Sequence, residues 1–242
     1  MICEVKDLKK EHDDVIILGC GTSINLLTRV HLPWLNTVDK MATNNFVIHP
    51  FIVPDFYAVE IKPEINGSFI KTMFELKKEE YKDTILLISR ENSMGGRQKA
   101  LVKYIDESKH KICIYETNSG KSRDGLCSPD PDKLITSVGS SMSILIDLAV
   151  KLQYKTVYFL GVDMYSSEYF WTDNTYYKDI DTSGIEFNYC TVPTRRKADE
   201  HMTAKSMLPF LKGFIEYNHI NAINLSPDSY LAEFMPTMEI PL

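Results

Sequence analysis

Residues 135–163, ITSVGSSMSILIDLAVKLQYKTVYFLGVD, decide the fold that the rest of the sequence must fit. A Gly/Ser turn (138–141) precedes apolar residues spaced three and four apart over 142–152, which predicts an amphipathic helix. The β-branched and aromatic run 156–160 then predicts a buried strand, followed by Asp163. Such a turn, helix and strand form half of a ligand site in an open α/β sheet, with helix N–H groups that suit phosphate. The alternative is a plain helix–strand unit with a serine cap.

Composition limits the classes of protein that the chain can belong to. The 242 residues allow one domain, 1–242, with 44% hydrophobic residues for its core. The net charge of −6 offers no broad basic surface for nucleic acid. Five scattered cysteines without a CxxC motif indicate reduced thiols. The charged segment 4–14 is unlike a signal peptide, and no apolar run approaches the about 18 residues of a membrane span. We therefore expect a cytoplasmic protein or one peripheral to a membrane.

A second glycine-rich turn lies near the amino end. Residues 15–18 (VIIL) predict a strand that is apolar on both faces, as a central parallel strand is. The turn 19–23 (GCGTS) follows, and Ser23 is placed to cap a helix whose N–H groups face a phosphate. Glycines in this turn would let the backbone approach a ligand closely. Because GxGxS is not the full GxGxxG fingerprint, a nicotinamide cofactor is not the expected ligand.

Further strands and helices alternate along the chain, which predicts an α/β fold with a doubly wound, mainly parallel, Rossmann-like sheet. Asn44 and Asn45 fall within a predicted strand, where asparagine is unfavourable. One of them is therefore assigned a hydrogen-bonding task, the alternative being a strand-end turn. Pro209 fits a helix only in its first turn, with Ser206 as the N-cap. The remaining strands are predicted at 41–47, 55–60, 84–89, 111–116 and 221–225, and helices at 68–78 and around 208–215.

Two long segments lack a helical or strand period. Residues 118–133 are rich in Gly, Ser, Asp and Pro and are interpreted as an exposed loop. Residues 164–198 are long and aromatic, which is typical of a lid-like insertion; the alternative is an ordinary insertion with local helices. The polar turns 19–23, Asn44, 140–141 and 226–229 all follow or flank strands. They are therefore predicted to gather at the sheet edge where ligands bind.

These turns, in this order, resemble glycosyltransferase family 42, the bacterial sialyltransferases. The similarity extends to motility-associated flagellin glycosyltransferases and to archaeal hydroxymethylpterin diphosphokinases. The family motif GNGPS is similar to residues 19–23, and its Asn-containing second strand is similar to residues 43–46. The motif TSG is similar to residues 140–142 and GIDFY to residues 161–165. The motif CPNSLLANF is similar to residues 226–234. The family's lid tyrosines fall on Tyr165 and Tyr169, and its late histidine falls on His201.

The resemblance implies a GT-A-variant sialyltransferase-type fold and an inverting, metal-independent transfer of sugar from a nucleotide-activated donor, such as CMP-sialic acid, to an acceptor hydroxyl. His201 would be the general base, which an ordinary histidine pKa near 6.5 suits. Tyr165 and Tyr169 would hydrogen-bond the leaving phosphate. No cofactor or metal is expected. The nucleotide- and donor-binding residues that the resemblance implies are Gly19, Cys20, Gly21, Ser23, Asn44, Ser140, Ser141, Asp163, Ser226, Pro227, Asp228 and Ser229.

The chain also departs from the family pattern. Cys20 replaces a family asparagine, Met142 a glycine and Ala198 a tyrosine, and no arginine stands just before Ser140. These departures leave the nucleotide and the donor sugar open. Alternative functions are a hydroxymethylpterin diphosphokinase-like pyrophosphoryl transfer from ATP with magnesium, and a non-catalytic nucleotide-binding domain. A metal-bound sugar nucleotide is a further alternative, from the DxD-like triplets 130–132 and 179–181. The sequence leaves the acceptor open among a glycan, a protein and a modified nucleic acid base. The resemblance also implies that the protein forms a homo-oligomer.

Overall fold

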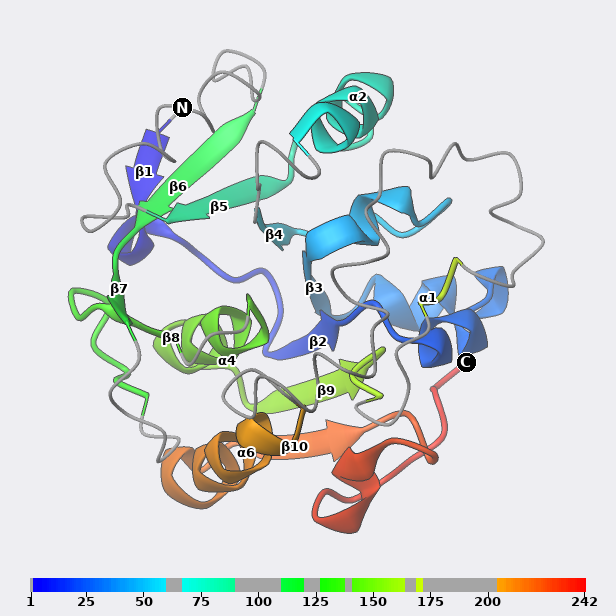
Figure 1. Cartoon of the computed structure of the whole chain (residues 1–242), viewed down its shortest axis with the longest axis vertical. Coiled ribbons are helices and arrows are strands. Elements are labelled where there is room, and N and C mark those ends of the chain that lie inside the picture. Colours follow the sequence, from blue (N-terminus) through cyan, green and yellow to red (C-terminus); the bar gives the residue numbers. More distant parts are fainter. Residues whose placement is uncertain are drawn as a thin grey trace.

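A parallel sheet forms the centre of the computed structural model, which describes residues 2–59, 67–89, 110–119, 127–137, 141–163, 169–171 and 204–242. Eight strands lie in the order β1-β6-β5-β4-β3-β2-β9-β10, and β7 pairs with β8 separately (Figure 1). The pairings are parallel. The strands are β1 (Ile2–Glu4), β2 (Asp14–Leu18), β3 (Asp39–Thr43), β4 (Phe56–Ala58), β5 (Ile85–Ser89), β6 (Lys111–Tyr115), β7 (Thr117–Ser119), β8 (Ile135–Ser137), β9 (Thr156–Leu160) and β10 (Asn221–Asn224).

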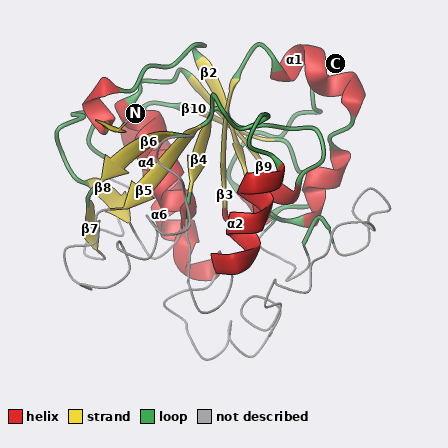
Figure 2. Cartoon of the chain, turned by 90° about the horizontal axis from the view of Figure 1, so that it is seen from above, coloured by secondary structure: helices red, strands yellow, loops and turns green. Residues whose placement is uncertain are grey.

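Helices cover both faces of the sheet because side chains of each strand point alternately to opposite sides. In β2, Ile16 and Leu18 join a core with α2 and the residues after β3, whereas Val15 and Ile17 join a core with α4 and α6. Figure 2 shows the sheet between α2 and the pair α4 and α6. The helices are α1 (Leu32–Leu35), α2 (Gly67–Leu76), α4 (Ser141–Lys151) and α6 (Ala204–Asn218), with 3₁₀ helices at Val5–Asp7, Thr22–Leu26, Arg29–His31, Asn44–Ile48 and Tyr230–Glu233.

The strand order changes direction beside β2. The chain runs from β2 through β3, β4 and β5 to β6 on one side, and then adds β9 and β10 on the other side of β2. The helices on the two sides of β2 cover opposite faces of the sheet, because α2 joins the core of Ile16 and Leu18 and α6 joins that of Val15 and Ile17. In doubly wound proteins, ligands bind at this topological switch point. The doubly wound, mainly parallel α/β fold predicted from the sequence is confirmed.

A buried ion pair fastens α4 to the segment 127–137. The side chains of Asp147 and Lys151 are fully buried and lie 2.9 Å apart, one helical turn from each other. Asp147 accepts a hydrogen bond from the backbone of Thr136 at 2.9 Å. The Lys151 ammonium also donates to the carbonyl oxygens of Ser128 at 2.8 Å and Asp130 at 3.3 Å. Each charge is thus hydrogen-bonded as well as paired, which is what a buried ion requires.

Three local predictions from the sequence are wrong. The predicted strand 41–47 ends at Thr43, and Asn44 begins a 3₁₀ helix with a φ of 57°, so Asn44 lies in a strand-end turn, where its side chain also accepts a hydrogen bond from Ser141. The predicted loop 118–133 is wrong at its first two residues, which belong to β7 and pair with β8, whereas its described residues 127–133 form neither helix nor strand. Pro209 lies beyond the first turn of α6, which starts at Ala204 rather than after Ser206. Packing of the neighbouring Phe210, Leu211 and Phe214 in the core outweighs the helix-breaking tendency of this exposed proline.

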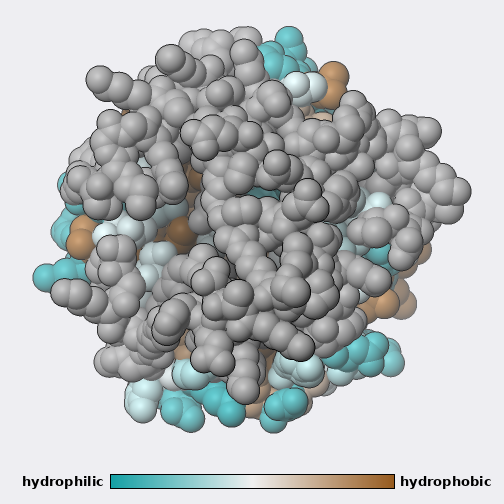
Figure 3. Space-filling view, viewed as in Figure 1, coloured by the Kyte–Doolittle hydropathy of each residue, from teal (hydrophilic) through white to brown (hydrophobic). Residues whose placement is uncertain are grey.

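No helix in the described ranges has the length and apolar character that crossing a membrane requires. At the rim of the face shown in Figure 3, described hydrophilic residues stand beside scattered apolar ones. The exposed large hydrophobic residues come from several elements, such as Leu26, Leu76 and Leu134. Scattered exposed apolar side chains of this kind are normal on a folded protein.

Candidate functional site

The turns after β2 and β9 are joined directly to each other. The backbone of Gly19 donates to Leu160 at 2.8 Å, and that of Gly21 donates to Gly161 at 2.8 Å. A Cβ atom added to Gly19 would lie 2.1 Å from the Gly161 carbonyl oxygen. These glycines are therefore needed because two backbones touch at the switch point. Sequence reasoning had assigned them to close contact with a ligand.

Asp163 is the centre of this junction. Its carboxylate is buried and accepts hydrogen bonds from the Ser23 backbone at 2.9 Å and from the Ser23 hydroxyl. It also accepts from the hydroxyls of Thr22 at 3.2 Å and Ser226 at 3.5 Å. The Ser23 hydroxyl accepts in turn from the Gly161 backbone at 2.9 Å. Asp163 and Ser23 therefore shape the turn, and the half-buried Cys20, Gly21 and Thr22 are its more accessible part.

The segment after β10 packs against the same junction, as predicted for residues 226–229. The buried Ser229 donates to the Val162 carbonyl at 2.7 Å and accepts from the Leu231 backbone at 3.1 Å, capping the short helix Tyr230–Glu233. Pro227 and Asp228 between the two buried serines are exposed. The structure thus brings together the turns 19–23, 161–163 and 226–229 at one edge of the sheet.

Asn44 faces this edge from the end of β3. Its side chain is exposed, and its Oδ1 accepts a hydrogen bond from the Ser141 hydroxyl, at the start of α4, at 3.3 Å. The Cys20 thiol lies 3.5 Å from the carbonyl oxygen of Thr43, the residue before Asn44. Four sequence-predicted site elements therefore lie at the carboxyl ends of β10, β9, β2 and β3, which are neighbours in the sheet.

A short aromatic segment lies on the turn after β2. Tyr169 and Gly21 form an antiparallel β-bridge, and the Phe170 backbone donates to the Cys20 carbonyl at 3.1 Å. The amide of Asn25 donates to the Phe170 carbonyl at 2.9 Å. Tyr169 stacks on Trp171 with ring centroids 4.3 Å apart. Residues 169–171 are the only described part of the predicted lid 164–198, and they are fixed to the turn by both backbone and side chain.

Phe170 anchors this segment in the core. Its ring is fully buried, with centroids 5.7 Å from Phe46 and 5.8 Å from His49. His49 is itself buried, and its Nδ1 accepts from the backbone of Ile52 at 3.1 Å. Burial first, and then the nearby Lys77 ammonium, lower the pKa of His49 to about 3. The neutral imidazole is therefore a packing group under the Asn44 turn.

His49 predicts an acid-sensitive fold. Its folded pKa lies below the ordinary value of 6.5, so the folded state excludes a proton that the unfolded chain binds. The contribution of the neutral His49 to the free energy of unfolding is complete above about pH 6.5 and falls as the pH drops toward 3. The expected loss is roughly 2 kcal/mol between pH 6.5 and pH 5. Urea titrations across this range should show it for the wild type, and a flatter profile for H49N, which keeps an acceptor near Nδ1. Parallel profiles for the two proteins would contradict the assignment.

Three predicted site residues, His201, Tyr165 and Ser140, lie outside the described residues, as do the triplet 179–181 and the rest of the lid. Among the described residues, no group of three or more His, Cys, Asp or Glu is arranged to hold a metal ion. Sequence reasoning missed Tyr57, Asn25 and Phe170, which hold the turns in place. An apolar run that contains an aromatic residue predicts only a place in the core, and no local pattern indicates which turn the residue supports.

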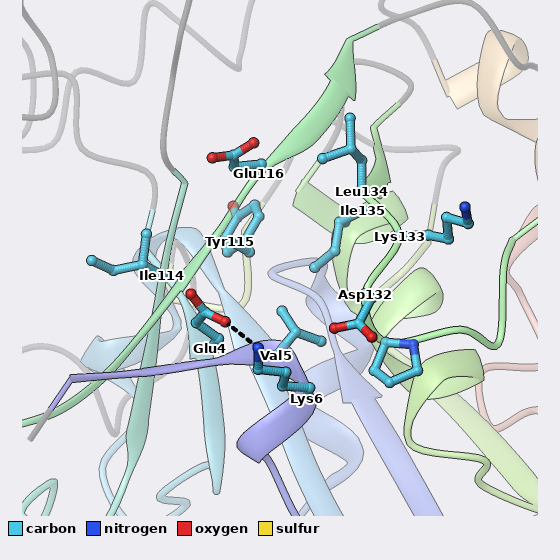
Figure 4. Close-up of a pocket in the computed structure, with 11 residues that line it drawn as sticks. Glu4, Val5, Lys6, Ile114, Tyr115, Glu116, Asp132, Lys133, Leu134 and Ile135 are labelled. Atoms are coloured by element: carbon cyan, nitrogen blue, oxygen red, sulfur yellow. Dashed lines mark ion pairs between the residues drawn. The ribbon is translucent and has the colours of Figure 1, made fainter.

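A separate cavity of about 160 Å³ lies at the opposite end of the strand order (Figure 4). It opens at the carboxyl ends of β1 and β6, and Glu4 pairs with Lys6 there at 2.9 Å. Asp132, from the first DxD-like triplet, lines this cavity. None of the predicted donor-binding residues that the structure describes does, so we place the candidate site at the switch point and not in this cavity.

A parallel sheet whose polar turns converge beyond β2 and β9 defines a Rossmann-like α/β protein, and the switch point is its candidate ligand site. No family model and no curated protein sequence matches the chain. Among solved structures, the sialyltransferase CstII from Campylobacter jejuni in complex with cytidine-5'-monophosphate superposes with a TM-score of 0.56 at 15% identity, covering 94% of this chain and 85% of that one. The CstII complex with CMP-3FNeuAc gives 0.54 at 18% identity, covering 97% and 87%.

The MAf glycosyltransferase from Magnetospirillum magneticum AMB-1 superposes with a TM-score of 0.52 at 15% identity. The match covers 97% of this chain and 34% of that larger chain. At these identities the comparisons show a shared fold. This chain has the α/β fold of the sialyltransferase-like glycosyltransferases, as the resemblance in its motifs predicted.

Proposed function

We propose that this protein transfers a sugar from a nucleotide-activated donor to an acceptor hydroxyl, with a CMP-sialic acid-like donor. The observation that carries the proposal is the match of the whole fold to a sialyltransferase that binds CMP and a CMP-sugar analogue, together with the convergence of polar turns at the switch point. Donor-binding roles are assigned to Asn44, Ser141, Pro227 and Asp228, and to the accessible part of the turn, residues 20–22. Ser23, Asp163, Ser226 and Ser229 position these groups through the hydrogen bonds described above.

The reaction inverts the anomeric carbon, with His201 as the general base that takes the proton of the acceptor hydroxyl. Tyr165 and Tyr169 stabilise the charge that develops on the leaving phosphate, and the site needs no metal. The β-bridge between Tyr169 and Gly21 supports this assignment because it places a tyrosine backbone against the donor-binding turn. The segment 164–198 closes over the donor.

Thermal unfolding with CMP, CDP, UDP, GDP and ATP, each with and without magnesium, tests the donor site. A ligand at about 100 times its dissociation constant adds roughly 2.7 kcal/mol to the stability of the folded protein. We expect CMP to raise the unfolding temperature equally with and without magnesium. Stabilisation by UDP or GDP would indicate a sugar donor that carries that nucleotide in place of CMP. A response to ATP with magnesium alone would favour pyrophosphoryl transfer instead.

Substitution of the proposed base tests the chemistry. We expect H201A to lower transfer from the CMP-sugar by about 100-fold or more, since general base catalysis contributes on that order. H12A is the matched control, because His12 precedes the amino end of β2, at the opposite edge of the sheet from the site. Transfer should be measured over a panel of oligosaccharide acceptors. Full activity of H201A would overturn the role of His201, whereas CMP binding without turnover in the wild type would indicate a binding domain.

A further inference from the structure

A single buried phenol closes the turn that presents Asn44. Tyr57 lies in β4 and is 1% exposed. Its hydroxyl donates to the Asn44 carbonyl oxygen and accepts from the Val47 backbone at 3.3 Å. Both partners belong to the 3₁₀ helix Asn44–Ile48. The hydroxyl thus contacts this short helix at two backbone positions, at its first residue and three residues further on.

Asn44 needs such support because its backbone is in the left-handed region, with a φ of 57°. Residues with a Cβ atom are disfavoured there, although asparagine tolerates it better than most. A conformation of this kind persists when its surroundings determine it from several sides. Tyr57 fixes the carbonyl of Asn44, and burial of Phe46 and Val47 fixes the residues that follow.

The side chain of Asn44 is fixed from a second element. The Ser141 hydroxyl, at the start of α4, donates to its Oδ1 at 3.3 Å. With Oδ1 occupied, the amide presents its Nδ2 hydrogens, and no described residue accepts from them. The side chain is also exposed. The turn therefore offers hydrogen-bond donors at the switch-point edge, and its ligand must supply acceptors such as phosphate or ribose oxygens or a base carbonyl.

We propose that Tyr57 is a positioning residue for nucleotide binding: its hydroxyl holds Asn44 in the left-handed conformation from which the amide donates to an acceptor group of the donor nucleotide. This inference rests on the proposed function and deepens it. Tyr57 does not touch the ligand. It acts through the Asn44 backbone, from behind the turn.

The chain contains a matched control. Tyr81 is also fully buried and belongs to the same aromatic cluster, with its ring centroid 6.1 Å from that of Tyr57. The Tyr81 hydroxyl is buried without a hydrogen-bond partner in the described part of the chain. Y57F and Y81F therefore delete the same atom from one cluster, but only Y57F breaks the bonds to the Asn44 turn.

Calorimetric titration with CMP, well below the unfolding temperature of each variant, tests the proposal. We expect Y57F and N44A to weaken CMP binding by about tenfold, and Y81F to bind within about twofold of the wild type. In the ligand-free proteins, the Val47 amide hydrogen should exchange with solvent faster in Y57F than in Y81F. The Asn44 side-chain NMR signal should shift with CMP in the wild type and in Y81F, and much less in Y57F.

The outcomes separate this inference from the function on which it rests. Wild-type affinity of Y57F, or an equal loss in Y81F, would overturn the role of Tyr57 and leave the donor site intact. A wild-type protein that binds no CMP would overturn the proposed donor, and the nucleotide-binding role of Tyr57 with it. CMP binding that is weakened in Y57F and N44A, but not in Y81F, would support both the role of Tyr57 and the proposed donor.

Discussion

Replacing Lys151 by methionine is expected to lower the free energy of unfolding by about 3–5 kcal/mol. The substitution leaves the Asp147 carboxylate inside the core with neither water nor a cation to stabilise it, since both side chains are fully buried. It also removes the donor that the Ser128 and Asp130 carbonyls share. Urea denaturation with an unchanged slope would measure the loss as a shift of the midpoint.

Two further variants separate the unpaired charge from lost packing. K155M removes a lysine that is 73% exposed in its pair with Asp13, and it should leave the midpoint nearly unchanged. In D147N/K151M the carboxylate is replaced by an amide, which keeps an acceptor for the Thr136 backbone and carries no charge. This double variant should recover much of the stability that K151M loses. A K151M midpoint equal to that of the wild type would contradict the importance of the pair.

The regular elements could be predicted from the sequence because their signals are local. The apolar run 156–160 coincides with β9, and the helical spacing over 142–152 nearly matches α4 (Ser141–Lys151). The Asn44 turn could not be predicted in the same way. Its left-handed backbone depends on Tyr57, which lies on another strand and pairs with Ala42 across the sheet. A contact between strands is set by register, which no short stretch of sequence contains.

The candidate site shows the same division between local and long-range information. Its place at the sheet edge follows from the order of strands and turns, and the sequence predicted it. The tasks of the individual residues do not follow. A glycine after a strand is as suitable for contact with a neighbouring backbone as for contact with a ligand, and Gly19 serves the neighbouring backbone. A polar residue at a strand end can likewise face a ligand or, as Asp163 does, fasten two turns together.

Asp163 gives the second large expected effect. In D163A, the Ser23 backbone N–H and hydroxyl lose their acceptor inside the protein, where each unsatisfied group costs about 1–3 kcal/mol. We expect a stability loss of about 3 kcal/mol or more and a weakening of CMP binding beyond tenfold, measured on the folded fraction. D163N keeps one acceptor oxygen and should lose less in both measurements.

The comparison of the two losses decides where the nucleotide lies. Gly21 packs so closely on this carboxylate that a Cβ atom there would lie 2.4 Å from its Oδ2, so release of Asp163 must change the turn 19–23. If stability falls in D163A while the folded fraction binds CMP with wild-type affinity, the turn does not contact the nucleotide. Wild-type stability together with wild-type affinity would show that the hydrogen bonds of Asp163 do not hold the turn. A joint loss, graded from D163N to D163A, would place the nucleotide on a turn whose shape depends on the carboxyl end of β9.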